Sequence, residues 1–434
     1  MFRSLRSARC RALALGLLAT TAAVPLIIAP QIPAAAATAR AASTGFGRAA
    51  EIVQPGNAAA DIDSILIGVA CTGHGDCSAG GSYTDTLGNS QAMVVTESRG
   101  TWGRGVEVKL PLNAGSDPYA QVNSVACTSP GNCVAVGYYR PTVGDDSGFI
   151  VSQRRGTWGR AVAATPLPVG TTGSGLYAVA CPASGSCEAA GSVVVGSAEE
   201  GIVLVQTHGK WSRDRTLSAP AGVGPDLSGI ACTRPGDCVA DGFYFPTGLE
   251  TVYDAVGYVE SHGKWGAAAP VRGPKNDTGT ETALASAACT PDGSCLGAGG
   301  YAVGSSGYPM AAAESGGKWR AATEILAQPP HAIGADLYSV SCASSRLCIG
   351  AGGYGTSTAG ELLAYLVSYV SGRWKDAGTV RLPANATISP VRSFFYAVGC
   401  ASDGYCVAVG DYHTKPVPKV APSGEYVPMV ATRS

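Results

Sequence analysis

Short apolar runs separated by turn residues recur along this chain at regular intervals. One stretch, SVACTSPGNCVAVGYY at residues 124–139, has an apolar run, a five-residue turn with Pro and Gly, and a second apolar run. Two such runs joined by a short Gly-containing turn predict a β-hairpin. The next segment, GFIVSQRR, and a strand that opens on tryptophan, TWGRAVAATPLP, predict a second hairpin. Each repeat is therefore expected to form four strands, A to D.

Alignment on the paired cysteines gives seven copies with a period of 51 to 58 residues, the length of a propeller blade and not of a short solenoid turn. A small residue precedes the first cysteine of every pair, and a glycine stands four positions after the second. Tyrosine follows that glycine by two positions in six of the seven copies. An invariant small residue in a strand indicates the close approach of another backbone, as crowding around a central axis requires. We interpret the repeated Gly and Tyr as packing residues, because a functional site would break the symmetry.

The chain has six tryptophans for seven cysteine pairs, so one strand D is missing at the C-terminus. GFGRAAEIVQP, residues 45–55, matches TWGRGVEVKLP, residues 101–111, with Phe46 in the tryptophan position. The N-terminal strand should therefore complete the last blade, and a closed ring leaves no open sheet edge. The predicted fold class is all-β, a seven-bladed β-propeller of four-stranded blades closed by the N-terminal strand. Residues 43–434 are expected to form this single domain.

Fourteen of the fifteen cysteines form seven pairs with the same C-x5-C spacing, and Cys10 is the exception. Zinc sites need four ligands at short spacings, and redox motifs favour C-x-x-C, so neither fits this pattern. Such regularity in an exported protein predicts local disulfides. The predicted pairs are Cys71–Cys77, Cys127–Cys133, Cys181–Cys187, Cys232–Cys238, Cys289–Cys295, Cys342–Cys348 and Cys400–Cys406.

The N-terminus has the pattern of a secretion signal. Four arginines precede an apolar stretch, and an Ala-rich segment then offers small-residue cleavage sites. We predict that residues 1–42 are a signal peptide, with an uncleaved membrane anchor as the alternative. No later segment approaches membrane-spanning length. The mature protein is expected to be secreted and monomeric, and attachment to the cell envelope stays open.

Charge and composition narrow the choice of partner. Charged residues make up 14% of the chain and the net charge is −1, so there is no basic excess to neutralise phosphates. A nucleic-acid partner is therefore not expected. No motif indicates a cofactor or a metal.

The blade pattern S-V-A-C, C-x-A-V-G-x-Y and G-x-W resembles a group of secreted bacterial repeat proteins that is common in actinobacteria. The resemblance covers essentially the whole mature chain. It implies a β-propeller, and it transfers no activity and no catalytic residue, because the group is generally of unassigned function.

Function is expected on the face that carries the B–C and D–A connections, because variable loops on a rigid scaffold usually bind ligands. Blade 4 breaks the symmetry with GFYFPTGLETVYDAVGY, which is rich in aromatic and acidic residues. The candidate ligand-binding residues are Tyr253, Asp254, Glu250, Asp145 and Asp146.

The favoured hypothesis is a non-catalytic binding or adhesion module for a glycan or an exported protein. The alternative is an extracellular polysaccharide hydrolase or lyase that uses loop carboxylates. An isolated acid pair about 5 to 9 Å apart would favour that enzyme. A third possibility is a purely structural envelope protein.

Overall fold

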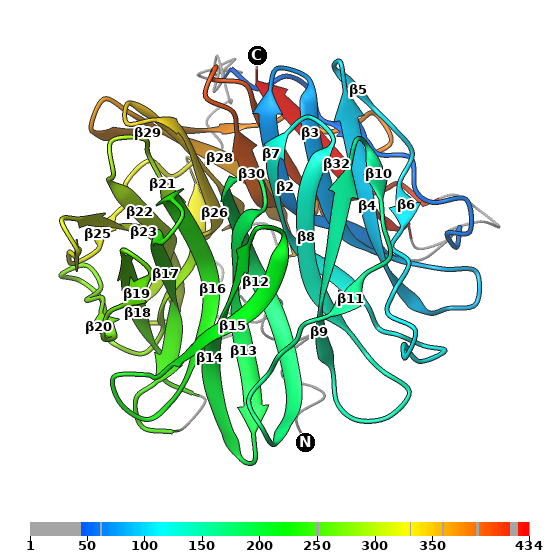
Figure 1. Cartoon of the computed structure of the whole chain (residues 1–434). Helices are drawn as coiled ribbons and strands as arrows, with labels where there is room; N and C mark the ends of the chain where they lie inside the picture. Colours follow the sequence, from blue (N-terminus) through cyan, green and yellow to red (C-terminus); the bar gives the residue numbers. More distant parts are fainter. Residues whose placement is uncertain are drawn as a thin grey trace, which may run out of the picture.

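The computed structural model describes residues 45–60, 63–248, 251–329, 331–357, 360–387, 390–416 and 424–433. All regular secondary structure in these ranges is β-strand, arranged in seven sheets around a ring (Figure 1). The innermost strand of each blade contacts the innermost strands of both neighbouring blades, and β30 of the last blade contacts β2 of the first. The predicted seven-bladed β-propeller is confirmed. The described ranges contain no helix long and apolar enough to cross a membrane.

Each blade runs from strand A at the channel to strand D at the rim. Blades 1 to 3 contain β2 (Ser64–Gly73), β3 (Asp76–Thr84), β4 (Ser90–Ser98), β5 (Thr101–Trp102), β6 (Val106–Glu107), β7 (Gln121–Ser129), β8 (Asn132–Tyr139), β9 (Ser147–Arg154), β10 (Thr157–Trp158), β11 (Val162–Ala163), β12 (Thr171–Ala183), β13 (Ser186–Val195), β14 (Ala198–Thr207) and β15 (Lys210–Leu217). In blades 1 and 2 strand D is split into two short pieces that both pair with strand C.

Blades 4 and 5 have the same split strand D, whereas blades 3 and 6 have one continuous strand D. Blades 4 and 5 contain β16 (Val223–Arg234), β17 (Asp237–Phe245), β18 (Asp254–Ser261), β19 (Lys264–Trp265), β20 (Ala269–Pro270), β21 (Thr282–Cys289), β22 (Cys295–Val303), β23 (Ser306–Ser315), β24 (Lys318–Trp319) and β25 (Thr323–Glu324). Blades 6 and 7 contain β26 (Ala332–Ser344), β27 (Leu347–Thr356), β28 (Leu362–Val370), β29 (Arg373–Thr379), β30 (Ser393–Cys400), β31 (Cys406–His413), β32 (Tyr426–Arg433) and β1 (Ala50–Glu51).

The N-terminal strand closes the ring as the tryptophan count predicts. β1 pairs antiparallel with β32, with Ala50 opposite Val430 and Glu51 opposite Met429. An isolated bridge joins Phe46 to Arg433. The last sheet therefore has the order β1-β32-β31-β30, and the first and last strands of the described residues lie in one blade.

A β-bulge in strand A explains the invariant glycine of strand B. In blade 2 the register between β7 and β8 shifts between Val122 and Ser124, and the same shift occurs in all seven blades. The bulge brings the carbonyl oxygen of Gln121 close to Gly137, where a Cβ atom would lie only 1.9 Å from it. Only glycine leaves room for that oxygen.

The small residue before each first cysteine has a separate cause. In blade 7 this residue is Gly399, and a Cβ atom added there would lie 2.8 Å from the carbonyl oxygen of Val69 in blade 1. The neighbouring strand A is that close, so a larger side chain would push two blades apart. The predicted crowding around the axis is confirmed.

The repeated tyrosine of strand B does more than pack. The Tyr139 hydroxyl donates to Asn113 Oδ1 at 2.9 Å, and Asn113 belongs to the D–A connection. In blade 1, the Tyr83 hydroxyl lies 2.9 Å from Asn57 Oδ1 and 2.6 Å from Glu107 Oε2, and its one hydrogen is shared between these two acceptors. Equivalent Tyr–Asn bonds occur at Tyr301 and Tyr412. The packing interpretation is therefore incomplete, because these hydroxyls also form hydrogen bonds that hold the D–A connections in place.

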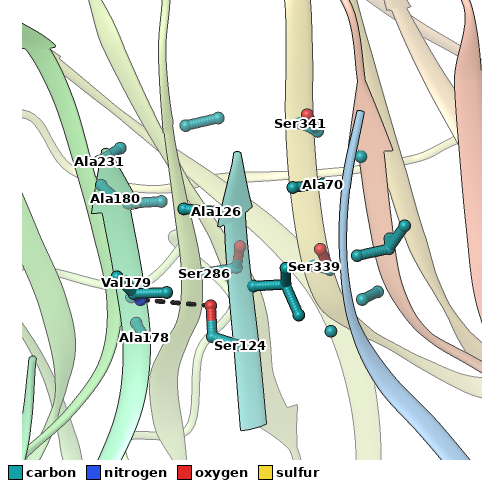
Figure 2. Close-up of a pocket in the computed structure, with 18 of the residues that line it drawn as sticks. Ala70, Ser124, Ala126, Ala178, Val179, Ala180, Ala231, Ser286, Ser339 and Ser341 are labelled. Carbon is teal, nitrogen blue, oxygen red and sulfur yellow. Dashed lines mark hydrogen bonds between the residues drawn. The ribbon is translucent and has the colours of Figure 1, made fainter. Parts of the chain in front are cut away.

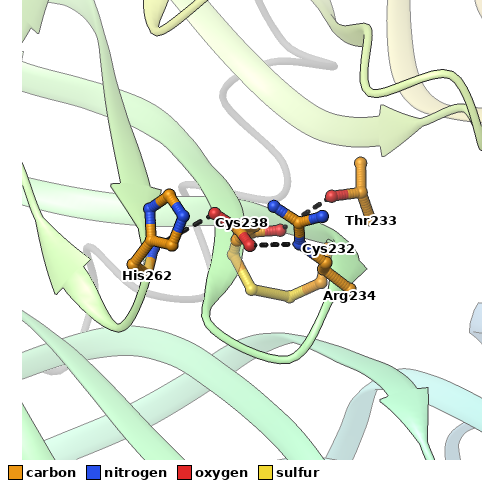
Figure 3. A network of polar contacts seen from close by, with 6 residues as sticks. Cys232, Thr233, Arg234, Cys238 and His262 are labelled. Atoms are coloured by element: carbon orange, nitrogen blue, oxygen red, sulfur yellow. Dashed lines mark hydrogen bonds and ion pairs between the residues drawn. A yellow bond between two sulfur atoms is a disulfide. The ribbon is translucent and has the colours of Figure 1, made fainter.

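All seven predicted disulfides are present, and each closes an A–B turn with a Cα–Cα distance of 3.9 to 4.1 Å. Figure 3 shows the bridge of blade 4 with Arg234 and His262 near it. Asp237 accepts from the Arg234 guanidinium and, at 3.1 Å, from the His262 backbone N–H, so the A–B turn is tied to the C–D turn. Closing so short a loop contributes about 2 kcal/mol per bridge.

Candidate ligand site at the channel mouth

The bulged residue of each strand A lines the central channel. It stands four positions before the first cysteine and has no partner in the register of strand B. A bulge re-aims a side chain, here toward the channel that the seven strands surround. The glycine of strand B is the same in every blade and the tyrosine in six of the seven, whereas this position varies from blade to blade. The seven bulged residues are Ile67, Asn123, Tyr177, Ser228, Ala285, Tyr338 and Tyr396.

The channel has two different ends. Every strand A runs from the loop face toward its disulfide, so the bulged residues lie at the loop end and the cystines at the other. The volume of the channel is about 430 Å³. Serines below the mouth bind the backbone of the next blade: Figure 2 shows Ser124 Oγ accepting from the Val179 N–H, at 3.2 Å. Ser286 and Ser339 repeat this bond to the next blade.

Aromatic rings form one side of the mouth. Tyr338 of blade 6 stacks on Tyr396 of blade 7 with ring centroids 5.9 Å apart and planes 29° apart. Phe394 stacks on Tyr396 at 5.8 Å and 24°. Tyr338 and Tyr396 are half-buried and both line the channel. Blades 6 and 7 therefore present a row of parallel rings.

The opposite side of the mouth, in blades 2 to 4, is more polar. Its bulged residues Asn123, Tyr177 and Ser228 all carry hydrogen-bonding groups. The Tyr177 hydroxyl lies 3.4 Å from Ser192 Oγ, which donates to Glu199 at 3.0 Å. One wall is therefore aromatic, and the facing wall combines the Tyr177 ring with hydroxyl and amide groups, of which the Asn123 amide already donates to the Leu176 carbonyl at 2.7 Å.

A buried carboxyl group lies next to the aromatic row, opposite Phe394 in the pairing of β30 with β31. Asp411 is 3% exposed, and the Tyr396 hydroxyl donates to its Oδ2 over a long 3.5 Å. Within the described ranges, its Oδ1 has no hydrogen-bond partner. Burial, and then the negative charge of Asp63, raises the pKa of Asp411 well above its ordinary value, whereas the Tyr396 bond opposes this shift.

Tyr253, one of the predicted site residues, lies where blades 4 and 5 meet on the loop face. Its side chain bonds Glu281, and a bridge of parallel backbone joins the two residues. The ring packs on Phe243 and Phe245 with centroids 5.3 and 6.4 Å away. Burial, and then the charges of Glu281 and Asp336, raises the pKa of the Tyr253 hydroxyl.

Asp336 of blade 6 acts electrostatically on the pair formed by Tyr253 and Glu281. Its carboxylate packs against two glycines of blade 5. A Cβ atom on Gly300 would lie 2.5 Å from Asp336 Oδ1, and one on Gly307 would lie 3.0 Å from the same oxygen. Burial, and then the negative charge of Glu281, raises the pKa of Asp336 to about 7. A large part of this carboxyl is protonated at neutral pH.

The other predicted site residues are spread over the face. Asp254 begins β18 and is half-buried; burial and then the charge of Asp277 raise its pKa, and its hydrogen bond with Tyr244 opposes this. Asp145 and Asp146 lie in the B–C connection of blade 2, where Asp146 pairs with Arg140 at 3.3 Å. Blade 3 stands between them and Tyr253. Glu250 lies outside the described residues.

Sequence reasoning missed the bulged residues, although a signal was present. They form a variable column between the invariant positions of strand A, and we considered only the invariant positions and the loops.

One cluster of possible metal ligands contains a disulfide. Ligand atoms of Glu188, Cys232 and Cys238 lie within 4.8 Å of one another. The two sulfur atoms are bonded to each other in a disulfide, so they offer no thiolate to a metal.

No family model and no curated protein matches the chain. The resemblance to secreted actinobacterial repeat proteins therefore stays a prediction. Solved propellers are similar in shape. An α-L-arabinofuranosidase from Fusarium graminearum has a TM-score of 0.44 at 12% identity, covering 89% of this chain and 98% of that chain. An ulvan lyase of polysaccharide lyase family PL25 has 0.47 at 10%, covering 90% and 97%. A fucose-specific lectin from Aleuria aurantia has 0.40 at 14%, covering 74% and 97%. At these scores, no functional argument follows from the similarities.

Proposed function

We propose that this protein is a secreted, non-catalytic binding module that holds a glycan at the channel mouth. The observation that carries the proposal is the ring of bulged residues, in which the aromatic wall of Tyr338 and Tyr396 faces the polar wall of Asn123, Tyr177 and Ser228. A sugar ring has the matching character, with an apolar C–H face and hydroxyl groups around its edge. Aromatic faces and hydroxyl or amide groups are the partners it needs.

The size of the site favours a glycan over the other ligand we considered, an exported protein. Stable protein interfaces bury about 800 Å² on each partner, which needs a broad surface. A channel of about 430 Å³ falls in the range of small-molecule sites. The seven disulfides agree with an oxidising, extracellular location.

Co-sedimentation with a panel of insoluble polysaccharides and cell walls tests the proposal, with the supernatant assayed for released sugar. We expect binding without release. The Ser228→Trp variant fills the mouth at a small bulged residue and should abolish binding. Ser116→Trp, at an exposed serine of a D–A connection, is the matched control and should bind normally. No binding to any polysaccharide, or equal binding by Ser228→Trp, would contradict the proposal.

A second candidate function is polysaccharide cleavage, and one observation favours it. Asp336 has a pKa raised to about 7 beside Glu281, which bonds Tyr253. A partly protonated carboxyl at neutral pH is what a general acid requires. Released sugar in the supernatant, lost in Asp336→Asn, would support this function and displace the non-catalytic one.

A further inference from the structure

The geometry of the channel mouth points to a narrower ligand class: we infer that the protein binds the terminal sugars of glycan chains and not the sugars inside a chain. This inference rests on the proposed function, because it concerns the same site. It adds which part of a polysaccharide the site accepts.

The channel is enclosed on all sides, so a ligand enters along its axis. Each strand A contacts both neighbours, and β30 contacts β2, so the wall is continuous. The Val179, Val340 and Val398 N–H groups bond to serines of the preceding blade and tie adjacent strands together. An interior sugar is linked to another sugar on each side. If it entered the channel from the loop face, both linked sugars would have to pass back out through the same opening. A chain lying across the loop face would therefore not reach the bulged residues with its interior sugars.

Threading through the channel is opposed by its size. The volume along the whole channel is about 430 Å³, near the lower end of the roughly 300–1,000 Å³ range of small-ligand pockets. Adjacent strands A are in close contact both at the mouth and beyond it, since a Cβ atom on Gly229 would lie 2.6 Å from the Ala287 backbone nitrogen and one on Gly399 would lie 2.8 Å from the Val69 carbonyl oxygen. The channel therefore holds one or two sugar residues, and these belong to a chain end.

The bulged residues leave a place for such a sugar between two tyrosines. Going around the ring, Ser228 and Ala285 stand between Tyr177 of blade 3 and Tyr338 of blade 6, and they are the two smallest of the seven side chains. A terminal sugar there would contact a tyrosine ring on either side and bond Ser228. Its end hydroxyl, which an interior sugar uses in its linkage, would point into the channel.

Chain length provides the test, with the polysaccharide that binds best in the panel as the probe. It is partly hydrolysed to shorter chains at constant total sugar mass, and chains are counted from their reducing ends. We expect the moles of protein bound per gram to rise in proportion to the number of chains, and the Kd per mole of chain to stay constant. Capacity per gram that stays unchanged or falls on hydrolysis would overturn the inference while leaving the proposed function intact.

Variants connect this behaviour to the mouth. Tyr338→Ala and Tyr396→Ala should each raise the Kd for a short oligosaccharide of the same glycan by about tenfold or more, because a ring that contacts the ligand is removed. Tyr119→Ala removes a half-buried tyrosine on the same face away from the channel and should leave the Kd unchanged. Melting curves check that each variant is folded. If a tyrosine variant does not fold, Ser228→Trp is measured in its place.

Equal Kd values for the wild type and both channel variants would overturn the inference. Failure to bind any glycan would instead overturn the proposed function, and the inference with it.

Discussion

The Tyr412 hydroxyl donates a hydrogen bond to Glu51 Oε2 at 2.8 Å, although the two residues are 361 positions apart. The same hydroxyl also contacts Asn385 Oδ1 at 2.8 Å, and the Asn385 amide donates to Glu51 at 3.0 Å. The same arrangement in blade 1 uses Tyr83, Asn57 and Glu107 from one continuous repeat. In blade 7 the glutamate comes from β1, so this triad joins the first described strand to the last blade.

Deleting residues 43–55 should therefore lower the melting temperature sharply. The deletion removes β1, its pairing with β32, and the buried side chains of Ala49 and Ile52. The outer edge of β32 would lose its partner. A thermal melt by circular dichroism measures the effect, and unchanged melting would mean that the N-terminal strand does not close the ring.

Tyr412→Phe tests the triad by itself. The change removes the hydroxyl that contacts Glu51 and Asn385. It should lower the free energy of unfolding by about 1–3 kcal/mol. Tyr365→Phe is the matched control, because the Tyr365 hydroxyl is fully buried and has no partner within the described ranges. That change should be neutral or stabilising in denaturant unfolding. A Tyr412→Phe protein as stable as the Tyr365→Phe protein would show that the triad does not hold the ring together.

Gly137→Ala should destabilise the protein strongly, by about 3 kcal/mol or more. A methyl group at this site would lie 1.9 Å from the Gln121 carbonyl oxygen, and backbone, not a flexible side chain, would have to move. Gly56→Ala has no atom within 4 Å of the new methyl group and should change stability by less than about 0.5 kcal/mol. Equilibrium unfolding in urea distinguishes the two variants. Similar values for both would contradict the assigned role of the bulge.

Asp241 should make stability depend on pH. It is 0% exposed, and neither carboxylate oxygen has a hydrogen-bond partner within the described ranges. Burial raises the pKa of Asp241 to about 8 from an ordinary 3.8. The folded protein therefore holds this proton more tightly than the unfolded chain, and the stability gained from it is complete below pH 4 and is lost progressively as the pH rises toward 8.

Asp241→Asn removes this titration, and Asp241→Val restores the residue found at the same position of blades 2 and 7, Val136 and Val409. Melting temperatures between pH 4 and 8 measure the effect. The gap between Asp241→Val and the wild type should widen with pH in favour of the variant. A constant gap would mean that Asp241 does not titrate in this range.

Mass spectrometry after non-reducing alkylation should find no free thiol in the mature chain. All fourteen cysteines after Cys10 are bridged. Labelling of two or more would overturn the pairing. Replacing Cys232 and Cys238 together by Ala should cost only about 2 kcal/mol, because the loop that the bridge closes is short.

Much of the fold could be derived from the sequence because each blade repeats the same local physics. The C-x5-C spacing fixed the A–B hairpins, and the count of tryptophans against cysteine pairs placed residues 45–55 in the last blade. These inferences need only neighbouring residues and the rule that sheet edges should be paired. The role of Tyr139 could not be found in this way, because its partner Asn113 is brought to it by the path of the D–A connection.

The candidate site depended on tertiary structure. The repeat alignment already assigned Asp145 and Asp146 to blade 2 and Tyr253 to blade 4, and the structure does not bring them together: Asp146 pairs with Arg140, and Tyr253 is bridged to Glu281 of blade 5. Tyr177, Tyr338 and Tyr396 are far apart along the chain, and only closure of the ring brings them around one channel. A bulge re-aims each of these side chains, and the bulge arises from the pairing of two strands and not from any single residue. The sequence by itself determined the blade and its disulfide, because both are set by contacts within about twenty residues. The tertiary structure decided which side chains meet at the axis, because seven blades must close before an axis exists.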